Sequence, residues 1–229
     1  MKTIGIIGGL SPESTMTYYR WLNDGVRERL GGNHNARTII SSVDFQEFKD
    51  LKDKGDWETQ GVLLAAQAAN LQRAGADFIL LSTNTMHKVA GQIEAAIDVP
   101  FLHLADTTAA RIGEAGLSKI ALLGTIHTMA EDFYKERLKA HGIEALVPDE
   151  ESQNVVSDII YDELCKGVVS DQSRERYKEI IAELEQQGAQ GVILGCTEIT
   201  KLIGPEDVNI PVFDTTKIHV EEALKSAFT

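Results

Sequence analysis

The residue best suited to chemistry in this sequence is Cys196, which follows the apolar run 191–195 and precedes Thr197 and Glu198. An apolar run that ends at a glycine is typical of a buried strand. Ligands of open α/β sheets bind outside the carboxyl ends of the strands, which is where Cys196 would lie. We expect the next residues to open a helix whose N–H groups lower the pKa of the thiol and hold an anion. Cys196 is then a thiolate base or nucleophile, and the alternative is a small buried apolar side chain.

A second copy of this stretch occurs in the first half of the chain. Residues 71–85 align with residues 184–198, and both read as a helix end, a Gly stop, a buried strand and a polar turn. Thr83 stands where the second copy has Cys196. Two further pairs of segments repeat in the same order: 4–8 with 120–124, and 98–102 with 209–213. The sequence therefore predicts an α/β protein of two similar halves, each a parallel sheet flanked by helices, related by pseudo-twofold symmetry.

The expected elements follow from this pattern. Strands are predicted at 3–7, 38–43, 76–81, 101–104 and 119–124, and helices at 12–30, 59–74 and 218–228. The polar segment 44–57 is predicted to form a loop and a short helix, and Cys165 is predicted to lie in the core. We assign residues 1–105 plus 210–229 to the first α/β domain and residues 106–209 to the second.

Composition excludes several classes of function. The chain has 229 residues, 43% of them hydrophobic and 25% charged, as in ordinary globular proteins. A formal net charge of −13 argues against nucleic acids and anionic membranes as partners. No apolar run has the roughly 20 residues that a membrane span needs. Two cysteines and no secretory pattern at the N-terminus favour a cytoplasmic location.

Pseudo-twofold symmetry would bring Thr83 and Cys196 to one ligand from opposite sides, across a cleft between the halves. Such an arrangement suits the removal of a proton from one face of a carbon and its return to the other face. N–H donors at the two turns would stabilise the enediolate that forms next to a carboxylate.

Three motifs carry a resemblance to a known family: Gly-Gly-Leu-Ser-Pro-Glu-Ser-Thr at 8–15, Thr-Asn-Thr-Met-His at 83–87 and Gly-Cys-Thr-Glu at 195–198. Together they resemble the aspartate/glutamate racemase superfamily, in its branch of amino-acid racemases that need no pyridoxal phosphate. The resemblance covers the whole chain. It implies two α/β domains with the site between them, a homodimer, an isomerase without a cofactor, and a dicarboxylic amino acid as substrate.

The resemblance also implies the catalytic pair. The family commonly uses two cysteines as its acid and base, one from each half, and here Cys196 is the second while Thr83 replaces the first. Because a hydroxyl is a far weaker acid than a thiol, Thr83 would be a poor base. We expect Cys196 to deprotonate L-amino acids readily and the reaction from the D-side to be slow.

The other site residues are carried over in the same way. The substrate α-carboxylate would be bound by polar residues after the strands, with two residues of the first motif closing the edge: Asn84, Thr85, Thr125 and Thr197, with Leu10 and Ser11. The distal carboxylate would be bound by Lys166 and Lys52, with Lys49 as the competitor of Lys52. No metal is expected, because His34, His127 and His141 do not form a ligand set.

Two neighbouring polar residues have ordinary explanations as well. His87 lies one helical turn after Thr83 and either orients the site or serves in capping and packing. Glu198 is interpreted as an acidic residue that complements a helix dipole. Two other functions remain open at this point: a decarboxylase or isomerase of the same superfamily that keeps only the second cysteine, and a protein that binds an amino acid without turning it over.

Overall fold

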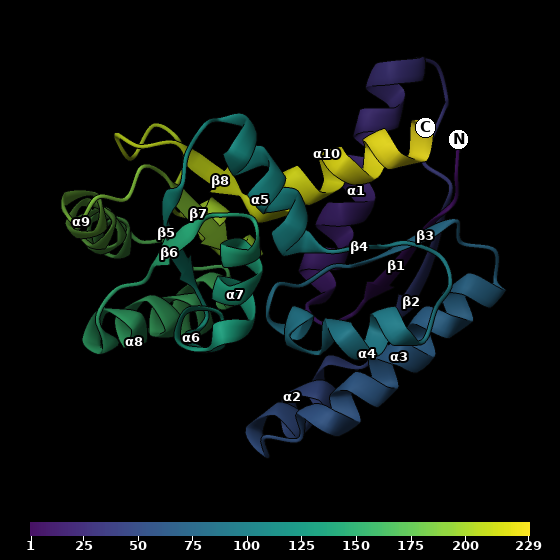
Figure 1. Cartoon of the computed structure of the whole chain (residues 1–229), viewed down its shortest axis with the longest axis horizontal. Helices are drawn as coiled ribbons and strands as arrows, with labels where there is room; N and C mark the ends of the chain where they lie inside the picture. Colours follow the sequence, from purple (N-terminus) through teal and green to yellow (C-terminus); the bar gives the residue numbers. More distant parts are fainter. The chain divides into compact units, whose positions relative to one another are not determined.

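The computed structural model describes residues 1–229 and divides into two compact units. Unit 1 comprises Met1–Leu104 and His219–Thr229, and unit 2 comprises Ala105–Ile218. Each unit contains a four-stranded parallel sheet flanked by helices (Figure 1), which confirms the predicted fold class of two similar α/β halves. Residues 210–218, which the sequence assigned to the first domain, lie in unit 2 because β8 (Val212–Asp214) pairs with a strand of that unit's sheet.

The sheet of unit 1 has the order β2-β1-β3-β4, and all neighbours are parallel. Its strands are β1 (Ile4–Gly8), β2 (Thr38–Ser42), β3 (Phe78–Leu81) and β4 (Phe101–Leu102). Its helices are α1 (Pro12–Leu30), α2 (Phe45–Asp53), α3 (Trp57–Arg73), the 3₁₀ helix η1 (Thr85–Val89) and α4 (Ala90–Ala95). The last helix, α10 (Thr215–Phe228), contains the boundary at which the chain returns to unit 1.

Alternate residues of the unit 1 strands pack into two separate hydrophobic cores, one on each face of the sheet. Ile4 and Ile6 pack with Tyr18 of α1 and Leu224 of α10 on one face of the sheet. Ile7 and its neighbours on β3 pack against α3 on the other face. Both faces of the central strands are thus covered, which is why β1 and β3 read as continuous apolar runs in the sequence.

The sheet of unit 2 repeats this arrangement in the order β6-β5-β7-β8. Its other strands are β5 (Lys119–Gly124), β6 (Glu144–Leu146) and β7 (Val192–Gly195). Its helices are α5 (Leu104–Glu114), α6 (Ile126–Ala130), α7 (Asp132–Ala140), α8 (Glu150–Asp158), the π-helix η2 (Ile159–Glu163), the 3₁₀ helices η3 (Leu164–Lys166) and η4 (Thr197–Lys201), and α9 (Asp171–Gln186). A large apolar cluster joins β5 and β7 to α8 and α9.

The prediction that Cys165 lies in the core is wrong. The helix that would have buried it gives way to a π-helix and then to the short turn η3, which buries Leu164 and leaves Cys165 exposed. No helix of the structure combines the length and the apolar character that crossing a membrane requires.

Candidate active site

Thr83 follows the carboxyl end of β3, where the first turn of α1 fixes the backbone. The Ser14 hydroxyl donates to the Ser82 carbonyl oxygen at 2.8 Å, and the Thr15 hydroxyl lies 3.1 Å from the Ser82 hydroxyl. The backbone N–H of Gly9 donates to the Thr15 hydroxyl at 2.9 Å. Ser14 and Thr15, two residues of the first motif, therefore act from behind the strand ends and hold the edge at which Thr83 emerges.

The turn after β1 requires glycine at position 9. Gly9 has a φ of 88°, and a Cβ at this position would lie 2.2 Å from the carbonyl oxygen of Val43. A backbone oxygen cannot move away as a flexible side chain can, so the turn can pass this close to Val43 only with glycine. Leu10 is buried beyond the turn, and Ser11 caps α1 by accepting from the Ser14 N–H at 3.3 Å.

The predicted residues of unit 1 gather at one edge of its sheet. Pairing of Ile7 with Leu81 brings the turn after β1 beside the turn after β3. The edge therefore collects Leu10 and Ser11 from one turn and Thr83, Asn84 and Thr85 from the other. Asn84 is buried, whereas Thr83 and Thr85 are half-buried.

Unit 2 has the corresponding edge. Gly124 pairs with Gly195, so Thr125 and Cys196 are the next residues along two neighbouring parallel strands. A Cβ on Gly195 would lie 2.8 Å from the Leu123 carbonyl oxygen, so glycine permits the close approach of these strand ends. Thr125 is buried, and its hydroxyl lies 3.2 Å from that of Thr128.

Cys196 interacts with a carboxylate. Its thiol donates a hydrogen bond to Glu198 Oε2 at 3.0 Å, and Glu198 is only 8% exposed. Burial and then the negative charge of Glu198 raise the pKa of Cys196 well above the ordinary thiol value. The expected net lowering of the pKa at this turn is wrong: the backbone N–H of Glu198 does lower the pKa, but burial and the Glu198 carboxylate outweigh it, and only the short 3₁₀ helix η4 follows. The resting Cys196 is therefore a thiol, and the Glu198 carboxylate is its hydrogen-bond acceptor.

The residue after Cys196 is tied to a second element of unit 2. The Thr197 hydroxyl lies 3.2 Å from the Thr216 hydroxyl, and Thr215 donates to the Leu194 carbonyl oxygen at 2.9 Å. The start of α10 is thereby held against the end of β7. Thr125, Cys196 and Thr197 thus form one group within unit 2, as the sequence predicts for the end of parallel strands.

The predicted lysines lie apart from these edges along the chain. Lys166 is exposed on η3 and pairs with Asp162 at 3.0 Å. Lys52 is half-buried in the last turn of α2, and Lys49 pairs with Asp53 of the same helix at 2.8 Å. The surface pair of Lys166 is weak, so the ammonium can exchange Asp162 for another carboxylate at little cost.

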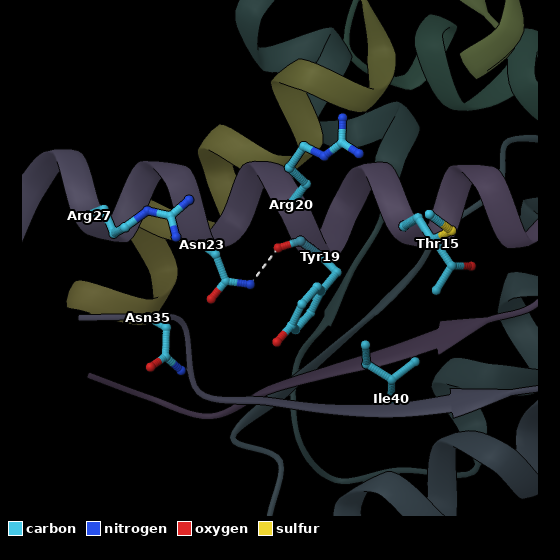
Figure 2. A pocket seen from close by; sticks show the side chains of 8 residues that line it. Thr15, Tyr19, Arg20, Asn23, Arg27, Asn35 and Ile40 are labelled. Atoms are coloured by element: carbon cyan, nitrogen blue, oxygen red, sulfur yellow. Dashed lines mark hydrogen bonds between the residues drawn. The ribbon is translucent and has the colours of Figure 1, made fainter. Parts of the chain in front are cut away.

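A groove of about 580 Å³ lies between α1 and the edge strand β2, and none of the predicted site residues lines it. Figure 2 shows Tyr19 and Ile40 in this groove, together with the hydrogen bond from Asn23 to the Tyr19 carbonyl oxygen at 2.6 Å. Thr15 reaches the groove from α1, but its hydroxyl is engaged with Ser82. The groove is therefore distinct from the edge that carries Thr83.

Comparison with known proteins identifies the family. A model of the Asp/Glu/hydantoin racemase family matches residues 7–223. The chain belongs to this family. The matched range includes both Thr83 and Cys196.

Individual relatives are similar to this chain over nearly its full length. The broad specificity amino-acid racemase RacX of Bacillus subtilis (strain 168) is 26% identical over 216 residues, which cover 93% of this chain and 92% of RacX. A crystal structure from Yersinia pestis, provisionally described as an Asp/Glu racemase, is 51% identical with a TM-score of 0.96 and covers 100% of both chains. An aspartate racemase homologue from Pyrococcus horikoshii OT3 is 36% identical with a TM-score of 0.89, again over 100% of both chains.

Sequence reasoning missed the roles of three residues in this racemase fold. Glu198 was interpreted as a dipole residue, although its carboxylate contacts the Cys196 sulfur. The signal in the sequence was a carboxylate two residues after a cysteine. Ser14 and Thr15 were recognised as part of a motif, but their contacts with Ser82 could not be read from the sequence, because they join residues far apart in the chain.

Proposed function

We propose that this protein is a cofactor-independent amino-acid racemase that acts on aspartate, glutamate or both and prefers the L-enantiomer. The observation that carries the proposal is the Cys196 thiol 3.0 Å from the Glu198 carboxylate at the end of β7, with Thr83 at the matching position of unit 1. Family membership and the amino-acid racemase RacX support the reaction class.

The proposed reaction begins with the L-enantiomer. Glu198 accepts the Cys196 proton, and the thiolate then takes the α-proton from one face of the substrate, so that the C–H bond breaks and an S–H bond forms. The electron pair passes into the carboxylate as an enediolate, which backbone N–H groups after the strands stabilise. Return of a proton to the opposite face, from Thr83 or a water molecule bound to it, gives the D-enantiomer. Solvent then reprotonates Thr83, and Glu198 releases its proton to solvent, so both groups return to their starting states while Cys196 keeps the former α-proton as a thiol.

The selectivity follows from the two acids. Deprotonation of a D-amino acid would require Thr83 as the base. No carboxylate contacts the Thr83 hydroxyl in the way that Glu198 contacts the Cys196 thiol. A hydroxyl is also a much weaker acid than a thiol, so its conjugate base is rarely formed near neutral pH. Abstraction from the L-enantiomer is therefore expected to be faster than abstraction from the D-enantiomer.

Substrate binding is proposed for the groups described above. The α-carboxylate is assigned to Asn84, Thr85, Thr125 and Thr197, with Leu10 and Ser11 at the edge. The distal carboxylate is assigned to Lys166 and to Lys52, with Lys49 as the competitor of Lys52. We propose in addition that the protein is cytoplasmic, as its two unpaired cysteines favour, and that it forms a homodimer, as the family resemblance implies.

The decarboxylase alternative is less well supported. A leaving carbon dioxide molecule needs an apolar slot, whereas the turn after β3 presents Thr83, Asn84 and Thr85. The buried amide of Asn84 in particular suits a carboxylate that stays in place.

The test is α-proton exchange in heavy water, followed by proton NMR with the L- and D-enantiomers of aspartate and glutamate. We expect the L-enantiomer of the preferred substrate to lose its α-proton signal at least about tenfold faster than the D-enantiomer. Equal rates for the two enantiomers would refute the assigned roles. Calorimetric binding without exchange would identify a binding protein instead.

A further inference from the structure

A cluster of buried histidines lies behind the Thr83 edge in unit 1. His87 of η1, His103 after β4 and His219 of α10 are each at most 6% exposed. The ring centroids of His87 and His103 are 4.6 Å apart, and those of His87 and His219 are 6.2 Å apart. None of these imidazoles takes part in the proposed reaction, so a different role must account for their burial beside Thr83.

The partners of His87 fix its protonation state. Its Nδ1 lies 2.7 Å from the Thr83 carbonyl oxygen, which can only accept, so Nδ1 must carry the proton. Its Nε2 lies 3.2 Å from the backbone N–H of Leu104, which can only donate, so Nε2 must be unprotonated. His87 is therefore a neutral imidazole in the Nδ1–H tautomer.

His219 has the opposite tautomer by the same reasoning. Its Nε2 lies 2.8 Å from the Leu102 carbonyl oxygen, so Nε2 carries the proton. Its Nδ1 lies 2.8 Å from the Tyr18 hydroxyl, which donates to it. Burial lowers the pKa of His219 to about 3, which agrees with a neutral ring. The two neighbouring histidines thus have opposite tautomers, so each provides a comparison for the other in an NMR spectrum.

The bond from His87 acts on the peptide that joins Thr83 to Asn84. The chain has no cis peptide bond, so the C=O of Thr83 and the N–H of Asn84 point in opposite directions across one rigid plane. Holding the carbonyl toward His87 consequently turns the Asn84 N–H away from the histidine cluster. The same plane sets the direction in which Thr83 leaves the strand.

We propose that His87 is a positioning residue, which orients the Thr83–Asn84 peptide through its Nδ1–H so that the Asn84 N–H faces the substrate carboxylate. The proposal rests on the proposed racemase function for its kinetic consequence, but its geometry can be tested without any substrate. His87 does not touch the reacting atoms and transfers no proton. Its second bond, to Leu104, holds the ring in place.

Two variants separate the two bonds of the ring. In His87→Asn the side-chain amide nitrogen occupies the place of Nδ1 and keeps the donor to Thr83, but loses the acceptor for Leu104. In His87→Gln the amide reaches the place of Nε2 and keeps the acceptor, but loses the donor to Thr83. Each variant loses one hydrogen bond, so a purely structural role predicts similar losses of melting temperature and of activity in both.

The positioning role predicts a different result. His87→Gln should lower kcat for α-exchange of the L-substrate by at least about tenfold, because a small misplacement of a binding group is costly for catalysis. His87→Asn should stay within about threefold of the unmodified protein. Equal losses in the two variants, no loss in either, or a larger loss in His87→Asn would overturn the proposal.

Nitrogen-15 NMR of the ligand-free protein gives a readout that does not depend on activity. Two-bond proton–nitrogen spectra should show the Nδ1–H tautomer for His87 and the Nε2–H tautomer for His219. The Asn84 amide signal should move in His87→Gln and stay in place in His87→Asn. An Nε2–H or charged His87, or an unmoved Asn84 signal in His87→Gln, would overturn the proposal. Absence of exchange in the unmodified protein would instead refute the racemase function alone.

Discussion

Replacing Glu198 with Gln should separate the amount of thiolate from the rate of catalysis. The substitution keeps the shape of the side chain and a carbonyl oxygen that can accept from the Cys196 thiol, but it removes the negative charge and the ability to take a proton. The charge of Glu198 raises the pKa of Cys196, so its removal should lower that pKa and increase the thiolate fraction at a given pH. Proton transfer from sulfur to the carboxylate should stop.

The size of the catalytic loss follows from the contact. The donor and acceptor are 3.0 Å apart, so the proposed transfer needs no bridging water molecule. A positioned acid or base contributes about 10²- to 10⁴-fold to the rate, and the barrier should rise by about 3 to 5 kcal/mol. Glu183→Gln is the matched control, because Glu183 is exposed on α9 in the same unit.

Two assays decide the outcome. The thiolate of Cys196 is titrated by its ultraviolet absorbance in a Cys165→Ala background, because Cys165 is exposed and would contribute its own signal. The α-exchange of the L-substrate is measured on the same samples. We expect more thiolate and slower exchange in Glu198→Gln. Exchange that rises in proportion to the thiolate would show that Glu198 only suppresses ionisation, and would refute its role as proton acceptor.

Three further changes test other parts of the account. Thr83→Cys should raise α-exchange of the D-enantiomer at least about tenfold in proton NMR, since a thiol forms its conjugate base more readily than a hydroxyl; an unchanged D-rate would remove residue 83 from the chemistry. Lys166→Gln should raise KM about tenfold with a smaller change in kcat, as expected for loss of one charged hydrogen bond; an unchanged KM in steady-state kinetics would exclude this lysine. His219 has a pKa near 3 in the folded protein and 6.5 as its ordinary value, so the unfolded chain takes up the proton first and stability falls as the pH drops below 6.5. Between about pH 7.5 and pH 5, the free energy of unfolding of the His219→Gln variant should fall by about 2 kcal/mol less than that of the unmodified protein, as measured by urea denaturation. An unaltered pH dependence would contradict the buried neutral ring.

The fold was accessible from the sequence because its signals are local. The apolar runs at β1, β3, β5 and β7 are covered on both faces, so their type could be read from composition alone. The short strand β6 was not predicted, because three partly exposed residues at a sheet edge carry no distinctive pattern. Cys165 was misplaced because α8 gives way to a π-helix and then to the short 3₁₀ helix η3, which leaves this residue exposed.

The site could be predicted as far as it depends on strand ends. The strand-end positions of Thr83 and Cys196 follow from the repeated pattern, since parallel strands end at a common edge. The protonation states did not follow from it. The pKa of Cys196 depends on where the Glu198 carboxylate turns, and the tautomer of His87 depends on Leu104, seventeen positions further along the chain. Such directions are set by packing and become visible only in the folded chain.

The central claim is that the sulfur of Cys196 removes the α-proton of an L-amino acid. The most direct measurement compares α-exchange of L-aspartate and L-glutamate in heavy water for Cys196→Ala and for Cys165→Ala, which removes the other cysteine. The account predicts that Cys196→Ala loses at least about 10³-fold of the exchange rate and that Cys165→Ala keeps the full rate. Exchange that survives in Cys196→Ala would contradict the account.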